Sequence, residues 1–189
     1  KNTIRTFFAI DLPVLTSEQI EKELLLKNSN LQNIKWASFS SMHITIKFIG
    51  EFNPGHQPSI QKDLLSHLRK FGEIKLSFGE MGVFPNFRNP RIVWLSLNER
   101  RQLIRLAQVV DLITSNYGYP KEKRSFSPHL TIGRVRNNAS SKDKELLGQK
   151  IANNESIDIE PFTTLSGNYK VYFTRYCGCS YSTLFRIPL

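Results

Sequence analysis

The sequence predicts an α+β fold built mainly from antiparallel sheets, and three observations support this class. Hydrophobic residues make up 40% of the 189 positions, an ordinary share for a globular chain. Strand-like and helix-like segments are mixed and joined by short loops, in the order β-α-β-β-α-β followed by β-α-β-α-β-β-β. The pattern His, apolar, Thr, apolar (HXTX) occurs twice, at 43–46 and 129–132, and Phe8 and Trp94 each precede one of its histidines by 35 residues. These repetitions indicate two copies of one unit.

The first strand and helix follow from residue types near the start of the chain. Residues 4–10 are β-branched and aromatic, so they predict a strand. Residues 16–28 predict a helix, with Thr16 placed to cap its N-terminus. Gln19 stands three residues after Thr16, where it would complete a capping box.

The next segments predict strands on either side of a second helix. Residues 43–49 alternate strictly between apolar and other side chains, as a strand does. Apolar residues recur at helical spacing in 59–71, and Gly72 is placed to end that helix. Residues 74–84 and 92–97 then predict two strands separated by a loop.

The second half predicts a long helix, a strand, a short helix and a run of strands. The long helix covers about 100–116 and is closed by a glycine and a proline. Its apolar face consists of Leu103, Ala107, Val110 and Ile113 or Thr114. A strand at 127–135 and a helix at 140–152, opened by Ser140 or Ser141, come next. The chain finishes with strand-like segments at 157–167, 169–174 and 182–189.

Composition argues against several classes of protein. Uninterrupted apolar runs reach only four residues, at 7–10 and 92–95, far below the roughly 20 that span a bilayer. The run near the N-terminus is also too short for a secretory signal, so we expect a cytoplasmic protein that does not enter the membrane. Cys177 and Cys179 are too close together in sequence to form a disulfide that stabilises a fold. The four histidines do not occur in a spacing typical of metal ligands. Neither a disulfide framework nor a zinc site is therefore expected.

The chain is strongly basic. It carries 26 Lys and Arg against 16 Asp and Glu, a net charge of +10. The excess is concentrated at 88–91, 100–105 and 121–136. Such clusters indicate a phosphate-bearing or polyanionic partner, and the alternative is a solvated basic surface that keeps the protein in solution.

The two HXTX patterns present the same side chains from two strands. Alternation places His43, Thr45 and Lys47 on one face of the first strand and the apolar residues on the other. His129 and Thr131 are arranged in the same way on the second strand. Histidine and threonine two positions apart lie roughly 7 Å from each other. One such strand would mean little, but two require a common reason.

A pair of histidines flanked by hydroxyls suits phosphodiester chemistry in a basic protein. One neutral imidazole can take a proton from the nucleophile, and the other, protonated, can give a proton to the leaving oxygen. The threonine hydroxyls can donate hydrogen bonds to non-bridging phosphate oxygens. This chemistry needs neither a metal ion nor an organic cofactor, and none is expected. No G-x-S-x-G, P-loop or paired-carboxylate motif offers a competing mechanism.

The sequence around these patterns resembles a known family. The segments FFAIDLP, HITIKFIGE, GVFPNFRNPRIVWL, SPHLTIGRV and YSTLFRIPL are similar to those of RNA 2',3'-cyclic phosphodiesterases, formerly called 2'-5' RNA ligases (ThpR or LigT). These enzymes belong to the two-histidine (2H) phosphoesterases, whose two HXTX motifs lie 80 to 90 residues apart. The resemblance implies a bilobal, duplicated fold with two mainly antiparallel sheets facing a central cleft, and helices on the outside. Residues 1–189 would then form a single two-lobed domain.

The resemblance also assigns roles to the residues that match the family's motifs. His43 corresponds to the proton donor, and His129 corresponds to the acceptor that activates water. Thr45 and Thr131 correspond to the groups that hold the phosphate. The segment YFTRYCGCSY departs from the family's usual sequence, so the base preference of the substrate groove stays open.

Arg134 matches an arginine that the family carries five residues after the second histidine. It is expected to bind phosphate, although alternation alone would place it on the same face as Leu130 rather than that of His129. Gly133 offers a solution, because a glycine can host a bulge that turns the next side chain over. A plain surface arginine is the alternative.

The expected activity is hydrolysis of an RNA 2',3'-cyclic phosphate end, leaving a 2'-phosphomonoester. The expected partner is RNA with such an end, and the protein is expected to act as a monomer without a metal. One alternative is 2'-5' RNA joining at the same site. Another is a non-catalytic RNA-binding module that uses basic charge and the aromatic residues Phe84, Phe87 and Trp94.

Overall fold

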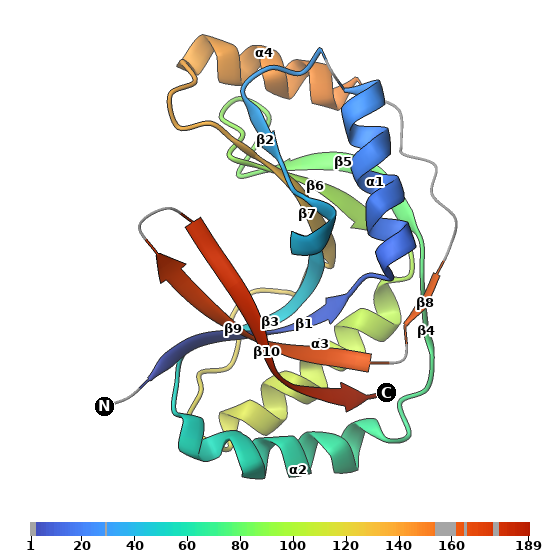
Figure 1. The fold of residues 1–189 in the computed structure, drawn as a ribbon, viewed down its shortest axis with the longest axis vertical. Helices are drawn as coiled ribbons and strands as arrows, with labels where there is room; N and C mark the ends of the chain where they lie inside the picture. Colours follow the sequence, from blue (N-terminus) through green and yellow to red (C-terminus); the bar gives the residue numbers. More distant parts are fainter. Residues whose placement is uncertain (1–2, 29, 154–161, 165, 176–177) are drawn as a thin grey trace.

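The computed structural model describes residues 3–28, 30–153, 162–164, 166–175 and 178–189 (Figure 1). Its helices are α1 (Val14–Lys27), α2 (Gln57–Leu68), α3 (Arg100–Ser115) and α4 (Ser141–Ala152), with short 3-10 turns at Phe39–Ser41 and Pro54–His56. Its strands are β1 (Ile4–Asp11), β2 (Ile34–Trp36), β3 (His43–Phe52), β4 (Ile74–Leu76), β5 (Phe78–Phe84), β6 (Ile92–Leu97), β7 (His129–Val135), β8 (Phe162–Thr164), β9 (Ser166–Arg175) and β10 (Gly178–Pro188). Cys177 and the first part of the strand expected at 157–167 lie outside the described residues.

The strands form two larger sheets and one small one. Sheet A has the order β10-β9-β1-β3, sheet B has the order β2-β7-β6-β5, and β4 pairs with β8. Every one of these pairings is antiparallel. Each larger sheet therefore carries one HXTX pattern, on β3 in sheet A and on β7 in sheet B. The predicted α+β class with mainly antiparallel sheets is confirmed.

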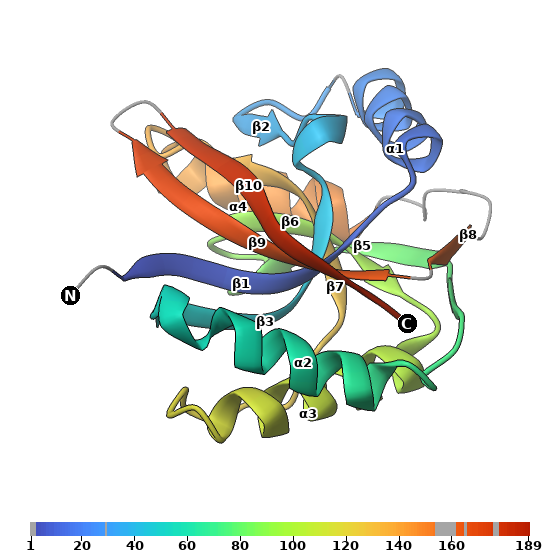
Figure 2. The ribbon, with the colours of Figure 1, turned by 60° about the horizontal axis from the view of Figure 1, so that its bottom comes forward.

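The helices lie on the outside of the two sheets. Figure 2 shows α2 and α3 side by side beneath sheet A, where α2 contacts β10 and α3 contacts β3. Helix α4 contacts β5 of sheet B, and α1 lies on the same half of the molecule (Figure 1). Helix α3 buries the apolar face that its sequence predicts, formed by Leu103, Leu106, Ala107, Val110, Ile113 and Thr114. Strands β3 and β7 contact each other, so the two HXTX strands meet where the sheets adjoin.

Helix α1 and the segment 74–84 differ from their predictions. Helix α1 begins at Val14 after Pro13, and no side chain caps it, so the prediction that Thr16 is the cap is wrong. Pro13 itself occupies the N-cap position, where its ring fixes φ, and the Ser17 hydroxyl donates to the carbonyl oxygen of Val14 (2.9 Å). The segment 74–84 forms two strands rather than one, because β4 pairs with β8 while β5 pairs with β6.

Helix α4 starts as its sequence predicts. Ser140 is the N-cap, and its hydroxyl accepts a hydrogen bond from the backbone nitrogen of Asp143 (3.1 Å). In return, the Ser140 hydroxyl and backbone N–H donate to the Asp143 carboxylate, at 2.7 and 3.1 Å. These donated hydrogen bonds favour the ionised carboxylate and lower the pKa of Asp143. The capping box therefore fixes the first turn of α4.

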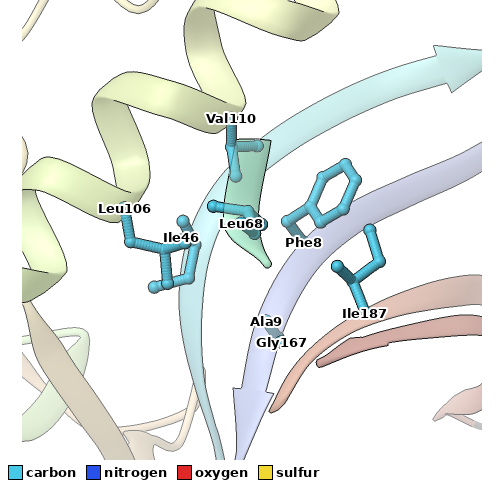
Figure 3. A pocket seen from close by; sticks show the side chains of 8 residues that line it. All are labelled: Phe8, Ala9, Ile46, Leu68, Leu106, Val110, Gly167 and Ile187. Atoms are coloured by element: carbon cyan, nitrogen blue, oxygen red, sulfur yellow. The ribbon is translucent and has the colours of Figure 1, made fainter. Parts of the chain in front are cut away.

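A small pocket lies in the core beneath sheet A (Figure 3). Strands β1 and β3 contribute to it from one side and helices α2 and α3 from the other. Its lining consists of Phe8, Ala9, Ile46, Leu68, Leu106, Val110, Gly167 and Ile187. The side chains shown offer no hydrogen-bonding group, so this pocket belongs to the core packing. Within the described residues, every helix is too short or too polar to cross a bilayer.

Candidate active site

The two HXTX histidines are held in the same way. His43 is the first residue of β3, and its Nδ1 lies 2.9 Å from the carbonyl oxygen of Ser41. His129 is the first residue of β7, and its Nδ1 lies 2.8 Å from the carbonyl oxygen of Ser127. A carbonyl oxygen can only accept, so each Nδ1 donates, and a neutral ring then has its lone pair on Nε2. Both histidines can therefore exchange a proton through Nε2.

Aromatic rings flank each histidine. The Phe7 ring of β1 stacks on the His43 imidazole, with centroids 4.9 Å apart and an angle of 24° between the planes. Tyr181 of β10 meets His43 edge-on at 5.5 Å. In sheet B, the Phe84 ring meets the His129 imidazole edge-on at 5.1 Å, and the Trp94 ring lies 6.3 Å away. These contacts hold the plane of each imidazole.

Phe7 and Tyr181 are neighbours of the site that the sequence analysis missed. They come from the first and last strands, so their contact with His43 depends on the order of strands in sheet A. Phe84 and Trp94, which the sequence offers as part of a non-catalytic RNA-binding surface, both lie beside His129. Phe8, whose spacing suggested equivalence with Trp94, is buried against Phe185 instead. The 35-residue spacing therefore does not mark equivalent positions.

A β-bulge places Arg134 on the same face as His129. Across β6 and β7, Ser96 lies opposite His129, Trp94 opposite Thr131, and Ile92 opposite Arg134. Directly opposed residues share a face of a sheet, and the half-buried positions 92, 94 and 96 alternate with buried ones. The register shifts between Thr131 and Gly133, so Ile132 is the extra residue. The bulge expected beside Gly133 is confirmed, and the exposed Arg134 side chain is on the histidine face.

The first strand contains a bulge at the matching place. Ala9 lies opposite Thr45 and Phe8 opposite Lys47, so Ile46 is the extra residue in β3. The prediction that Lys47 shares a face with His43 is therefore wrong. A bulge shifts the alternation by one position, and Lys47 is turned to the face covered by helix α3.

Lys47 and Phe48 have exchanged the faces that strict alternation would give them. The Lys47 side chain is 5% exposed, pairs with the Asp111 carboxylate of α3, and donates to the Pro120 carbonyl oxygen at 3.0 Å. Phe48 is 71% exposed and lies opposite Phe7, whose ring is 5.7 Å from its own. Since Phe7 also stacks on His43, Phe48 belongs to the histidine face of sheet A.

The described residues contain no cluster of three or more His, Cys, Asp or Glu side chains that could hold a metal ion. The chemically active groups of the candidate site are thus two imidazoles, two hydroxyls and one guanidinium. These are the groups of His43, His129, Thr45, Thr131 and Arg134.

The sequence that carries this arrangement matches a known protein family. The model of the 2'-5' RNA ligase superfamily matches residues 25–162, a range that contains both HXTX patterns and Arg134. The chain belongs to the 2'-5' RNA ligase superfamily. A superfamily relative from Methanocaldococcus jannaschii, named RNA 2',3'-cyclic phosphodiesterase, is 30% identical over 178 residues, which cover 89% of this chain and 96% of that protein. A protein of the same name from Archaeoglobus fulgidus is 34% identical over 133 residues, 70% of this chain and 73% of that protein.

Solved structures of similar proteins show the same fold. Escherichia coli LigT in complex with 3'-AMP superposes with a TM-score of 0.75 at 22% identity, covering 100% of this chain and 99% of that one. A Thermus thermophilus protein superposes with a TM-score of 0.77 at 18% identity and 98% coverage of each chain. The LigT-like fold implied by the sequence of this 2'-5' RNA ligase superfamily member is confirmed.

Proposed function

We propose that the chain hydrolyses RNA 2',3'-cyclic phosphate ends to 2'-phosphomonoesters. The observation that carries this proposal is the matching environment of His43 and His129. Each begins a strand, donates from Nδ1 to the carbonyl oxygen two residues earlier, and is flanked by aromatic rings. Two imidazoles that both donate from Nδ1, and so carry the titrating lone pair on Nε2, suit a reaction that needs one base and one acid. Relatives named RNA 2',3'-cyclic phosphodiesterase support the same choice.

The two histidines would act in opposite protonation states. His129 Nε2 takes a proton from water while the water oxygen forms a bond to phosphorus. The bond from phosphorus to the 3' oxygen breaks, and His43 Nε2 gives its proton to that oxygen. The product has a free 3' hydroxyl and a phosphate on the 2' oxygen. Proton exchange with solvent then restores both rings.

The hydroxyls and the guanidinium would hold the phosphate. Thr45 and Thr131 share the histidine faces, and each hydroxyl can donate to a non-bridging oxygen. Arg134 shares the face of His129 and can pair with the same group. Because the acid and base are side chains, the proposed reaction needs no metal or cofactor. The proposal includes a monomeric protein in the cytoplasm, acting as one two-lobed domain.

Joining of RNA ends through a 2'-5' bond is the second candidate. The description of the superfamily itself names this activity. A 5' hydroxyl from a second RNA would replace water as the nucleophile, and the same base and acid would serve. Hydrolysis predominates unless the second RNA is held in line with the 3' oxygen.

A product analysis in the presence of EDTA tests the proposal. An oligonucleotide with a 2',3'-cyclic phosphate end is incubated with the protein, alone and with a second RNA that has a 5' hydroxyl. A product with phosphate on the 2' oxygen supports hydrolysis, and a longer RNA with a 2'-5' bond supports joining. Absence of both products, or activity only after a divalent ion is restored, contradicts the proposed mechanism.

A further inference from the structure

A hollow beside the end of β7 gathers five cationic side chains. Two asparagines contribute to the same lining, and no acidic residue does. The cations are Lys35, Arg91, Arg134, Arg136 and Lys144. They come from β2, from the residue before β6, from β7 and the residue after it, and from α4. Segments far apart in the sequence thus converge on one concentration of positive charge.

These cations are not used to hold the fold together by ion pairing. The ion pairs found in the described part of the chain are Lys27 with Glu23 and Lys47 with Asp111, and neither involves the hollow. Like charges brought this close repel one another, which disfavours the compact state. Because the hollow gives no compensating carboxylate, a negatively charged ligand is its natural complement.

The backbone around the hollow is fixed. The amide of Val135 donates to the carbonyl oxygen of Arg91 (2.9 Å), and the amide of Arg136 donates to that of Asn33 (2.7 Å). Lys35 lies directly opposite Arg134 in the pairing of β2 with β7. These bonds hold the backbone that carries the cations, so less ordering is needed when a ligand binds.

The hollow continues the histidine face of sheet B. Arg134 lies opposite both Ile92 and Lys35, and the row of Trp94 and Thr131 separates it from His129. Because Ile132 is bulged, His129 and Arg134 are separated by the four-residue distance between Ser96 and Ile92, about 13 Å along a strand. A chain whose end is held at His129 would therefore pass Trp94 and reach the hollow within a few nucleotides. The indole offers a base a stacking surface on the way.

We propose that this hollow binds the sugar-phosphate backbone of single-stranded RNA on the 5' side of the cyclic end. The inference rests on the proposed function and adds a second contact site, at which the hollow holds the RNA strand upstream of the cyclic end. Phosphate contacts of this kind supply affinity without reading sequence, and they are sensitive to salt. The hollow thus favours longer RNA ends of any sequence.

The test compares two substrates and two triple variants. The substrates are a nucleoside 2',3'-cyclic monophosphate, which has no upstream phosphate, and an oligonucleotide with a cyclic phosphate end. One variant combines Lys35→Gln, Arg91→Gln and Arg136→Gln, all exposed positions in the hollow. The matched control removes three charges on and after α2, with Lys62→Gln, Arg69→Gln and Lys70→Gln. Helix α2 lies at the opposite end of the molecule from α4 (Figure 1).

We expect the hollow variant to lose affinity for the oligonucleotide but not for the mononucleotide. Its KM for the oligonucleotide should rise about tenfold or more. The slope of log affinity against log salt concentration should become shallower by about 2, because each phosphate that the variant no longer neutralises removes roughly 0.7 from that slope. Its kcat/KM for the mononucleotide should stay within about twofold of wild type. The control variant should keep kcat/KM within about twofold of wild type on both substrates. An unchanged KM for the oligonucleotide, as expected if the hollow serves an acidic protein, overturns the proposal. An equal loss on both substrates also overturns it.

Direct binding separates this proposal from the proposed activity. A labelled oligonucleotide that ends in a 2'-phosphate is titrated against wild type and both variants by fluorescence anisotropy. Weaker binding only in the hollow variant supports the hollow even if wild type hydrolyses neither substrate. Equal binding by all three proteins overturns the hollow even if hydrolysis is found.

Discussion

Phe48 occupies the position in β3 that Arg134 occupies in β7. Each stands three residues after the threonine of its HXTX pattern, and one extra residue, Ile46 or Ile132, forms a bulge in between. Both side chains are exposed, on the same face as the histidine of their strand. The two halves of the molecule therefore repeat the bulge but place an aromatic ring in one half and a cation in the other.

This asymmetry predicts that Phe48 supports a base of the RNA substrate. Phe48→Ala should lower kcat/KM on an oligonucleotide by an amount equivalent to about 1 to 3 kcal/mol, the usual contribution of base stacking on an aromatic ring. Phe48→Tyr keeps the ring and should retain activity. Since the side chain is 71% exposed, neither change should lower the urea midpoint of unfolding appreciably. Equal activity of the Ala and Tyr variants contradicts a stacking role.

The Lys47 ion pair is predicted to stabilise the fold without taking part in turnover. Asp111→Ala leaves the buried Lys47 ammonium without its carboxylate and should lower the free energy of unfolding by about 3 to 5 kcal/mol. Lys47→Met removes the buried charge itself and should lower the free energy of unfolding by less than Asp111→Ala does. Urea denaturation of both variants measures these differences. Because Lys47 faces α3, kcat of the folded Lys47→Met protein should be near that of wild type, and a large loss of kcat would assign Lys47 to the active site.

The capping box of α4 predicts a pH dependence of stability. The hydroxyl and N–H of Ser140 lower the pKa of Asp143 in the folded state. A lowered pKa adds stability above the unfolded-state pKa, and this is lost as the pH falls through the folded-state pKa. Asp143→Asn should therefore lower the free energy of unfolding at neutral pH. In acid, where Asp143 of wild type is protonated, the difference in stability between the variant and wild type should become smaller. Urea midpoints over this pH range test the prediction, and a constant difference contradicts it.

Most of the fold that could be predicted from the sequence follows from the regular spacing of apolar residues in helices and strands. The apolar face of α3 follows helical spacing, and the segment from His43 to Ile46 alternates as expected. The HXTX pair singled out the two histidines of the candidate site, because the acid-base chemistry it suits depends on residue types and short spacings. The sequence also indicated the bulge in β7, because Gly133 is a residue that tolerates one.

What the sequence could not predict depends on breaks in periodicity and on strand order. The bulge at Ile46 has no glycine beside it, so strict alternation assigned Lys47 and Phe48 to the wrong faces. Contact of Phe7 and Tyr181 with His43 depends on β1, β3 and β10 sharing one sheet. Convergence of the cations around β7 likewise depends on the pairing of β2 and β6 with that strand.

The two histidines are predicted to act as a coupled acid and base. His43→Ala and His129→Ala should each slow turnover by roughly 10² to 10⁴-fold, and the double variant should lose less than the product of the two. The rate of wild type should be bell-shaped against pH, with limbs that report the pair rather than either ring alone. His67→Ala, at an exposed position of α2, is the matched control and should leave the rate and its pH profile unchanged.

Affinity should respond much less than turnover to these histidine substitutions. RNA binding depends mainly on Lys and Arg contacts with phosphates, so a 2'-phosphate oligonucleotide should bind both alanine variants nearly as tightly as wild type. A non-catalytic RNA-binding module would show no bell-shaped profile and no selective loss of turnover. If His129→Ala keeps turnover within about threefold of wild type, His129 is not the base, and the proposed mechanism fails. Steady-state rates and anisotropy titrations on the same preparations distinguish these outcomes.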